Sequence, residues 1–138
     1  MDSVEFSDHT DGIDWAALKA ALVADDFDNK RSVEQYGLSH ENSHAVVFAC
    51  DQGRFVANGR ILSDGVCNAY LVDIWTATSH RRQGIGSEVV RRLLATVPGQ
   101  HVGLFTEDMA AFYQPLGFTE QRTGMSRVVG RWLDNQSQ

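Results

Sequence analysis

The chain has 138 residues, the size of one domain. Its 12 Lys and Arg against 18 Asp and Glu give a formal net charge of −6, which argues against a surface built to neutralise nucleic-acid phosphates or to bind an anionic membrane. The longest apolar run, Ala45–Cys50, is six residues long, far below the roughly 18 that a membrane helix requires. We expect one globular domain over 1–138, with no nucleic acid and no membrane as partner.

The cysteines and the spacing of possible metal ligands help to predict the cell compartment and whether the protein binds a metal. The two cysteines, Cys50 and Cys67, lie in apolar, strand-like stretches, so we expect two buried, reduced thiols. Metal binding would need more ligands at close spacing than this sequence offers, so we expect no metal. The amino terminus has neither a basic n-region nor an apolar h-region. These features predict a cytoplasmic, metal-free protein.

The first half of the chain predicts a strand, two helices and three consecutive strands. Asp14 is a good N-cap for a helix whose apolar residues recur at helical spacing up to Val23. Turn residues at 51–53 and 63–65 join the three later strands into an antiparallel meander. The expected elements are strand Val4–Phe6, the helix after Asp14, a short helix Ser32–Tyr36, and strands Ala45–Cys50, Arg54–Leu62 and Val66–Thr76.

The second half alternates helices and strands. An amphipathic pattern predicts a helix from Ile85 to Val97, ended by Pro98-Gly99. The further elements expected are strand His101–Phe105, helix Met109–Leu116, and strands Phe118–Thr123 and Met125–Leu133. The order β-α-α-β-β-β-α-β-α-β-β describes a mixed sheet with helices on its faces, an α/β (α+β) single domain.

A glycine-containing segment links the strand ending at Thr76 to the helix starting at Ile85. It reads Arg81-Arg82-Gln83-Gly84-Ile85-Gly86-Ser87. A helix N-terminus leaves about four backbone N–H groups without intrahelical partners and carries a positive dipole end. Glycines let an anion approach that backbone, although each costs roughly 1 kcal/mol in a helix. The segment therefore predicts a pyrophosphate cradle.

Three known phosphate-binding patterns can be compared with this segment. No Gly-x-x-x-x-Gly-Lys-Ser/Thr run occurs, and the dinucleotide pattern Gly-x-Gly-x-x-Gly/Ala fails because Val89 stands at its third position. The pattern Arg/Gln-x-x-Gly-x-Gly/Ala is satisfied by Arg81, Gly84 and Gly86.

On these residues the sequence resembles the GNAT superfamily, the Gcn5-related N-acetyltransferases. The match to the coenzyme-A motif runs from Asp73-Ile74-Trp75-Thr76 through the glycine segment. A second element, Phe112-Tyr113-Gln114-Pro115-Leu116-Gly117-Phe118, is similar to the family's Phe-Tyr-x-x-x-Gly-Phe helix and turn. One helix and one strand separate the two elements, as in the family.

The resemblance implies a role for each matching segment. Backbone groups of Ile74, Trp75 and Thr76 would line the pantetheine arm and bind the thioester carbonyl, through a splay in the sheet. Backbone N–H groups of Arg82, Gln83, Gly84, Ile85, Gly86 and Ser87 would hold the pyrophosphate, supported by the side chains of Arg81 and Arg82. Tyr113 would sit near the sulfur as general acid.

The general base is left open, because the family has no fixed base residue. Asp73, Asp64 and Glu107 are the candidates, with Asp73 taken as catalytic alongside Tyr113. Each has a structural alternative: Asp73 as a carboxylate accepting backbone hydrogen bonds, Asp64 as a turn residue before Gly65, Glu107 as a helix cap, and Tyr113 as core filling.

The resemblance implies an acetyl-CoA-dependent N-acetyltransferase that moves an acetyl group to a primary amine of a small molecule or peptide, by direct attack in a ternary complex. Acetyl-CoA is the co-substrate. The alternatives are a non-catalytic acyl-CoA-binding or regulatory domain of the same fold, and a nucleotide-binding module. An exposed edge strand near the carboxyl terminus would allow a homodimer.

Overall fold

The computed structural model describes residues 3–135. They fall into two compact units, one ending at Phe105 and one starting at Thr106, and each unit is considered by itself. That the whole chain forms one domain stays a prediction.

The first unit is built on a five-stranded sheet in the order β1-β2-β3-β4-β5. Neighbouring strands are antiparallel except for β4 and β5, which are parallel. The tight turns predicted at 51–53 and 63–65 produce the antiparallel meander. The strands are β1 (Val4–Ser7), β2 (Ala45–Asp51), β3 (Arg54–Ser63), β4 (Asn68–Thr76) and β5 (His101–Gly103).

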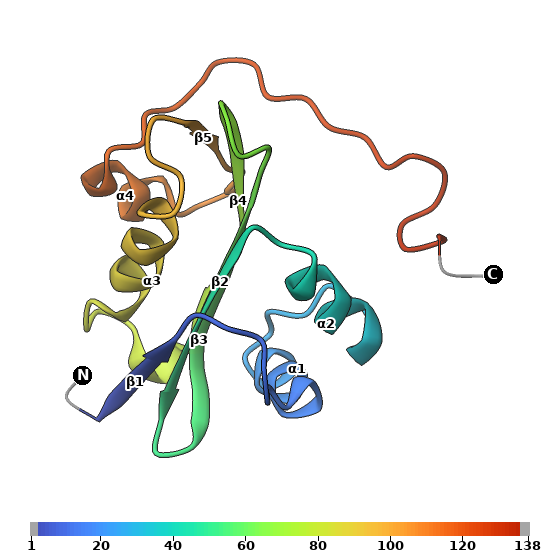
Figure 1. The fold of residues 1–138 in the computed structure, drawn as a ribbon, viewed down its shortest axis with the longest axis vertical. Helices are drawn as coiled ribbons and strands as arrows, with labels where there is room; N and C mark the ends of the chain where they lie inside the picture. The colour runs from blue at the N-terminus through green and yellow to red at the C-terminus, as the bar shows by residue number, and fades with distance from the viewer. Residues whose placement is uncertain (1–2, 136–138) are drawn as a thin grey trace. The chain divides into compact units, whose positions relative to one another are not determined.

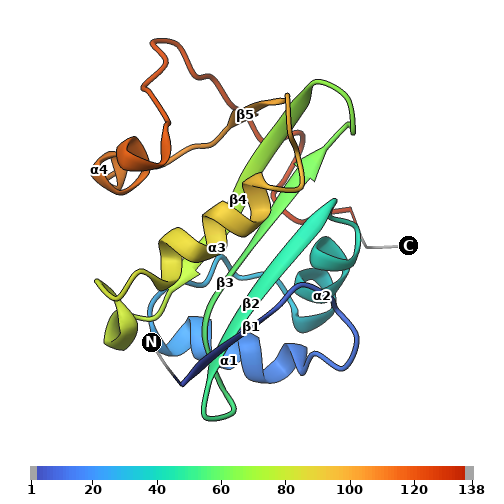
Figure 2. The same cartoon turned by 60° about the vertical axis from the view of Figure 1, so that its left-hand side comes forward.

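Helices cover both faces of this sheet (Figure 1). Helices α1 (Trp15–Ala24) and α2 (Val33–Glu41) lie on one face, and α3 (Ile85–Leu94) lies on the other. Figure 2 shows α3 running along one face of the sheet, where it contacts β2, β3 and β4. Asp14 caps α1 through its side chain, and Ser32 with Gln35 forms a capping box on α2. Helix α2 is longer than expected from the sequence, since it continues to Glu41.

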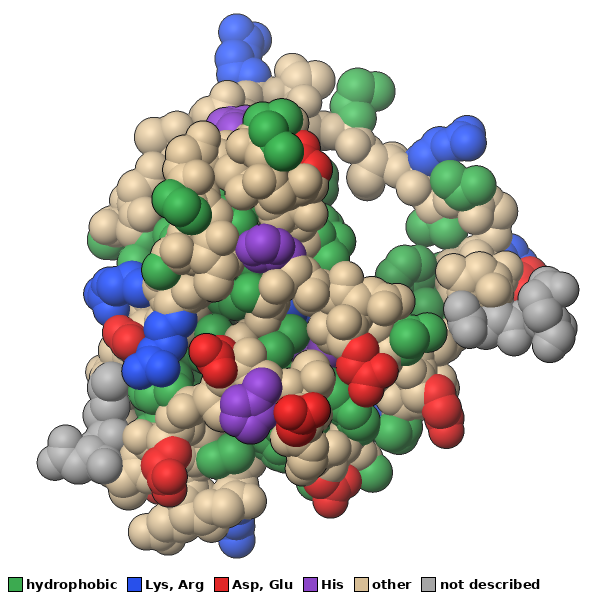
Figure 3. Space-filling view, viewed as in Figure 1, with side chains coloured by type: hydrophobic (Ala, Val, Ile, Leu, Met, Phe, Trp, Pro, Cys, Tyr) green, Lys and Arg blue, Asp and Glu red, His purple; other side chains and the backbone are tan. Residues whose placement is uncertain are grey.

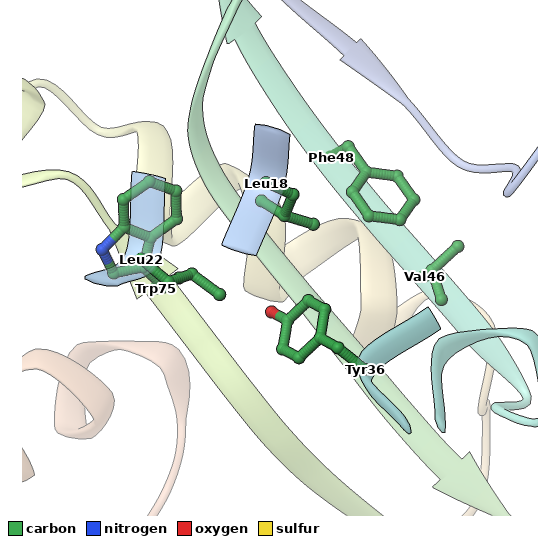
Figure 4. Packing of buried hydrophobic residues seen from close by; sticks show 6 residues of the cluster. All are labelled: Leu18, Leu22, Tyr36, Val46, Phe48 and Trp75. Atoms are coloured by element: carbon green, nitrogen blue, oxygen red, sulfur yellow. The ribbon is translucent and has the colours of Figure 1, made fainter. Parts of the chain in front are cut away.

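The core on the α1/α2 face is a cluster of aromatic and aliphatic side chains (Figure 4). Its buried members come from both helices and from β2 and β4: Leu18, Leu22, Tyr36, Val46, Phe48 and Trp75. On the other face, α3 buries the apolar stripe that the sequence predicted, with Ile85, Val89 and Leu93 at most 1% exposed.

The second unit contains α4 (Ala110–Tyr113) and a 3₁₀ turn (Gln114–Leu116) that ends at Gly117. The predicted strands Phe118–Thr123 and Met125–Leu133 are wrong, because no strand occurs between residues 118 and 135. Met125, Val128 and Val129 are exposed there. A strand needs a partner for its backbone N–H and C=O groups, and the described part of this unit contains no strand to supply one.

The expected burial of both thiols is also wrong. Cys50 is half-buried and Cys67 is exposed, and neither takes part in a disulfide. Cys67 lies just before β4, next to an exposed turn. The Asp64 carboxylate accepts a hydrogen bond from the Cys67 N–H there. None of the helices among residues 3–135 has the length and apolar content that crossing a bilayer demands.

Candidate active site

Strand β4 separates from β5 halfway along its length. The parallel pairing covers only Asn68 to Tyr70 on β4, opposite His101 to Gly103 on β5. Strand β4 continues to Thr76, so its backbone edge from Leu71 onward has no β5 partner. This is the splay that the resemblance implied, and it offers backbone donors and acceptors to an extended ligand.

A β-bulge lies in the separated part of β4. Asn58 pairs with Trp75 and Arg60 pairs with Val72, so the single residue Gly59 on β3 faces both Asp73 and Ile74. Asp73 has φ 60°, in the left-handed region that non-glycine residues rarely adopt. The Asp73 and Ile74 side chains point to opposite faces of the sheet, as consecutive strand residues do: Asp73 meets Arg31 from the α1–α2 loop, and Ile74 lies over Gly59 beside α3.

Two guanidinium groups hold the carboxylate of Asp73. Arg31 donates to both of its oxygens, at 2.9 and 3.0 Å, and Arg60 donates to Oδ2 at 2.7 Å. Burial alone raises the pKa of the Asp73 carboxyl, but the two cations outweigh that effect and hold the pKa below its usual range. An anion engaged in this way is a weak proton acceptor, so the contacts favour a structural role for Asp73, with arginine side chains as its donors where the sequence suggested backbone N–H groups.

The segment after β4 forms the loop that the sequence predicted as a pyrophosphate cradle. A 3₁₀ turn, Thr78–His80, comes first, and Arg82 (φ 64°) and Gly84 (φ 83°) then adopt left-handed angles. Gly84 is the N-cap of α3 and makes no side-chain cap. Helix α3 therefore opens with the backbone N–H groups of its first turn next to two exposed arginines, Arg81 and Arg82.

Side chains from other elements fix the base of this loop. Arg81 donates through Nε to the Thr76 carbonyl at 3.1 Å. His80 lies 2.7 Å from Asp51 Oδ2 through Nε2, although its sequence position suggested a solvated loop residue. Asp25, at the end of α1, accepts from the Trp75 indole at 2.9 Å and from the Thr78 N–H.

Sequence reasoning missed Asp25, Arg31 and Arg60. Each contributes through a partner more than ten positions away along the chain. No local spacing or motif marks such residues, since their role comes from the sheet register and from the loop between α1 and α2.

A cavity of about 330 Å³ opens beside the bulge. It is lined by the α1–α2 loop and by β4, namely Asp26, Phe27, Asp28, Asn29, Arg31 and Asp73. Figure 3 shows that most acidic side chains visible from this side lie in the lower half of the view, where α1 and α2 are found. Negative surroundings of this kind favour the approach of a cation.

The other candidates lie apart from the bulge or in the second unit. Asp64 accepts from the N–H groups of Val66, Cys67 and Asn68, which holds the pKa of its carboxyl far below its usual range and confirms the turn interpretation. Glu107 is exposed in the second unit. Tyr113 belongs to that unit too, where its ring packs edge-on against Phe112 and Phe118. Burial raises the pKa of Tyr113 to about 12, so its hydroxyl keeps its proton at neutral pH.

Among residues 3–135, no three His, Cys, Asp or Glu side chains come together as metal ligands. His40 and His44 are four residues apart in the sequence, but they face different partners. His40 is buried against the Tyr36 carbonyl and Asn58, and His44 lies 3.2 Å from the Thr96 carbonyl.

Comparison with known proteins identifies the family to which the sequence is similar. The sequence profile of the Acetyltransferase (GNAT) family matches residues 11–118. Serotonin N-acetyltransferase 2, chloroplastic, from Oryza sativa subsp. japonica is 31% identical over 115 residues, which is 78% of this chain and 57% of that protein. GCN5-related N-acetyltransferase 3, chloroplastic, from Arabidopsis thaliana is 25% identical over 82% of this chain and 49% of that protein. The chain thus spans about half the length of these two relatives.

A solved structure shares the fold. The acetyltransferase of the GNAT family from Streptococcus pneumoniae TIGR4 superposes with a TM-score of 0.77 at 23% identity, covering 93% of this chain and 99% of that one. The mixed sheet expected from the sequence is therefore confirmed as the fold.

Proposed function

The chain belongs to the acetyltransferase (GNAT) family, and from this premise we propose that it transfers an acetyl group from acetyl-CoA to a primary amine of a small molecule or peptide. The observation that carries the proposal is the continuity of two features. The unpaired edge of β4, Leu71–Thr76, leads directly into the glycine loop that opens α3. An elongated molecule with an anionic end fits such a path.

Different residues along this path are proposed to bind different parts of the cofactor. The backbone of Ile74, Trp75 and Thr76 lines the pantetheine arm, while the Trp75 side chain is buried in the core. The N–H groups from Arg82 to Ser87 hold the pyrophosphate, and the exposed side chains of Arg81 and Arg82 add positive charge. No metal is part of this proposal.

The chemistry is a direct attack of the amine on the thioester carbonyl carbon. The C–N bond forms, negative charge develops on the carbonyl oxygen, and the C–S bond breaks with the electron pair leaving on sulfur. One backbone N–H aimed at that oxygen can contribute roughly 3 kcal/mol. By resemblance to the family alone, Tyr113 is proposed as the general acid that supplies a proton to the departing thiolate.

The acceptor amine is proposed to enter the cavity beside the bulge. Its walls carry the carboxylates of Asp26 and Asp28, which suit an ammonium group before it loses its proton. Because Asp73 is held by two guanidinium groups, we assign it to positioning, and the proton of the amine leaves through water rather than to Asp73.

The test is product formation by the full chain. Acetyl-CoA is incubated with a broad panel of primary amines, and acetylated products are identified by mass spectrometry while released thiol is followed with a thiol reagent. Calorimetry with coenzyme A, ATP and NAD runs in parallel. Coenzyme-A binding without any product would favour the non-catalytic acyl-CoA-binding alternative, and preference for ATP or NAD would overturn the assignment.

Location and assembly stay proposals. We propose the cytoplasm because Cys50 and Cys67 are both free thiols. A homodimer stays a proposal, although the carboxyl-terminal edge strand expected to form it is absent between residues 118 and 135; light scattering on the purified chain measures its mass directly.

A further inference from the structure

We propose that Arg31 and Arg60 are positioning residues that hold the β4 bulge, through Asp73, in the geometry that the reaction requires. The inference rests on the proposed function for its kinetic consequence. Its structural part concerns only the first unit.

Arg31 ties the α1–α2 loop to the bulge. The residue is 8% exposed, and its guanidinium binds both oxygens of Asp73 in a bidentate pair. The same group donates to Asn29 Oδ1 at 2.7 Å through Nε and lies 4.3 Å above the centre of the Tyr36 ring. Hydrogen bonds hold this planar guanidinium at its edge, and the Tyr36 ring packs against its face, so the group has a single orientation.

Arg60 ties the same carboxylate to the end of α2. It reaches Asp73 Oδ2 at 2.7 Å through Nε, and its NH1 lies 3.4 Å from the Ser39 carbonyl and 3.3 Å from Ser43 Oγ. A cation near the last carbonyls of a helix is stabilised by the helix dipole. Asp73 is therefore held from a loop and from a helix end at once.

These contacts matter because the bulge is strained. Asp73 keeps φ 60°, a left-handed conformation that is unfavourable for a residue with a Cβ and persists where its surroundings support it. Two cations share one anion, so removing either arginine leaves the other paired. Removing Asp73 would instead leave two like charges side by side, which is the more disruptive change.

Asp73, the first residue of the bulge, immediately precedes Ile74, Trp75 and Thr76, whose backbone groups we propose to face the thioester. A rotation at Asp73 would redirect all of these groups. Misplacement by about 1 Å can slow a reaction about 100-fold, whereas the pyrophosphate cradle at Arg82–Ser87 lies further along the chain and would keep its affinity.

The experiment compares Arg31→Met and Arg60→Met with Lys19→Met. Lys19 makes an ion pair of 2.6 Å with Asp28 in the same α1–α2 loop but does not touch Asp73, so Lys19→Met loosens the loop without releasing the bulge. Four quantities are measured on each folded variant: kcat, the Kd for coenzyme A, the melting temperature, and amide hydrogen exchange across residues 72–76.

In Arg31→Met and Arg60→Met we expect kcat to fall about 10- to 100-fold, the coenzyme-A Kd to change less than threefold, and exchange across 72–76 to rise at least tenfold. Arg31→Lys restores part of kcat. Lys19→Met keeps the wild-type exchange across residues 72–76. Unchanged exchange in a folded Arg31→Met, or an equal rise in Lys19→Met, overturns the positioning role. An inactive wild type refutes the proposed function alone, because the exchange measurement does not depend on turnover.

Discussion

Two left-handed residues other than glycine, Asp73 and Arg82, lie at either end of the proposed cofactor path. Residues other than Gly, Asn and Asp rarely adopt this conformation, and Asn and Asp do so less readily than Gly. Asp73 has support from Arg31 and Arg60, while Arg82 is exposed two residues before Gly84. The backbone is thus held in unusual angles at the two places where a ligand would approach it most closely.

Gly84 provides a test of the cradle. Because Gly84 has φ 83° at the start of α3, Gly84→Ala is expected to lower the free energy of unfolding by about 1 kcal/mol and to raise the coenzyme-A Kd about tenfold, as measured by calorimetry. Gly65→Ala is the matched control, since Gly65 has φ 80° in the β3–β4 turn with open space around an added Cβ. An equal affinity loss in both variants would remove the cradle assignment.

Tyr113→Phe tests the general acid. The ring packing against Phe112 and Phe118 is kept, so the melting temperature should change little. Loss of the phenol proton is expected to lower kcat about 10- to 100-fold, the lower part of the range for one acid–base group, without altering acetyl-CoA affinity. Tyr70→Phe, an exposed tyrosine on β4, serves as the comparison. Wild-type turnover in a folded Tyr113→Phe would assign this residue to packing alone.

At the level of elements, the contact between β3, β4 and α3 determines where the bulge forms. A Cβ at Gly59 would lie 2.5 Å from Ile74 Cδ1, 3.0 Å from Val89 Cγ1 and 3.1 Å from Leu93 Cδ1. Glycine at this position lets the bulged strand and the helix pack against the same point of β3. The helix that carries the proposed cradle is thereby held against the strand that carries the proposed acyl site.

Gly59→Ala is expected to destabilise the protein by about 1–3 kcal/mol through overpacking, measured by urea unfolding. Gly103→Ala on β5 is the control, because an added Cβ there meets nothing within 4 Å. Adding Ile74→Val removes the Cδ1 atom, so the double variant should recover part of the loss. Strict additivity of the two changes would contradict this account of the bulge.

At the scale of the whole molecule, a buried polar network joins α2 to the sheet. His40, 1% exposed, has Nδ1 at 2.9 Å from the Tyr36 carbonyl, which requires Nδ1 to carry the proton. Nε2 then accepts from Asn58 Nδ2 at 3.1 Å. Asn58 Oδ1 is buried without a hydrogen-bond partner among the described residues. The network suits a neutral imidazole only.

Stability should therefore fall in mild acid. Burial lowers the pKa of His40 from 6.5 to about 4, against an opposing effect of the Tyr36 carbonyl and of Asp73. Because the unfolded chain takes up the proton first, the contribution of neutral His40 is complete above pH 6.5 and is lost as the pH falls toward 4, by about 3 kcal/mol at most. The lowered pKa of Asp73 acts in the same direction at lower pH, below about 3.8.

The measurement is urea unfolding at several pH values between 7 and 4.5. His40→Phe is expected to be less stable at pH 7, since it removes the hydrogen bond between Asn58 Nδ2 and His40 Nε2, but to show a shallower loss of stability with falling pH. His101→Gln, at an exposed histidine on β5, should retain the wild-type slope. A wild-type slope in His40→Phe would show that other groups cause the acid sensitivity.

The residue pattern by itself predicted the mixed sheet, the meander, the amphipathic α3 and the glycine loop, because these depend on local spacing and turn chemistry. It also carried the resemblance to the family, since both motifs are contiguous in the chain. The resemblance also implied the splay of the sheet at β4, but the bulge opposite Gly59 and the partners of Asp73 required the tertiary structure. They arise where strands, a loop and a helix end meet from positions 13 to 42 residues apart. The strands expected after Phe118 show the same limit, because a strand forms only where the fold supplies a neighbour for its backbone.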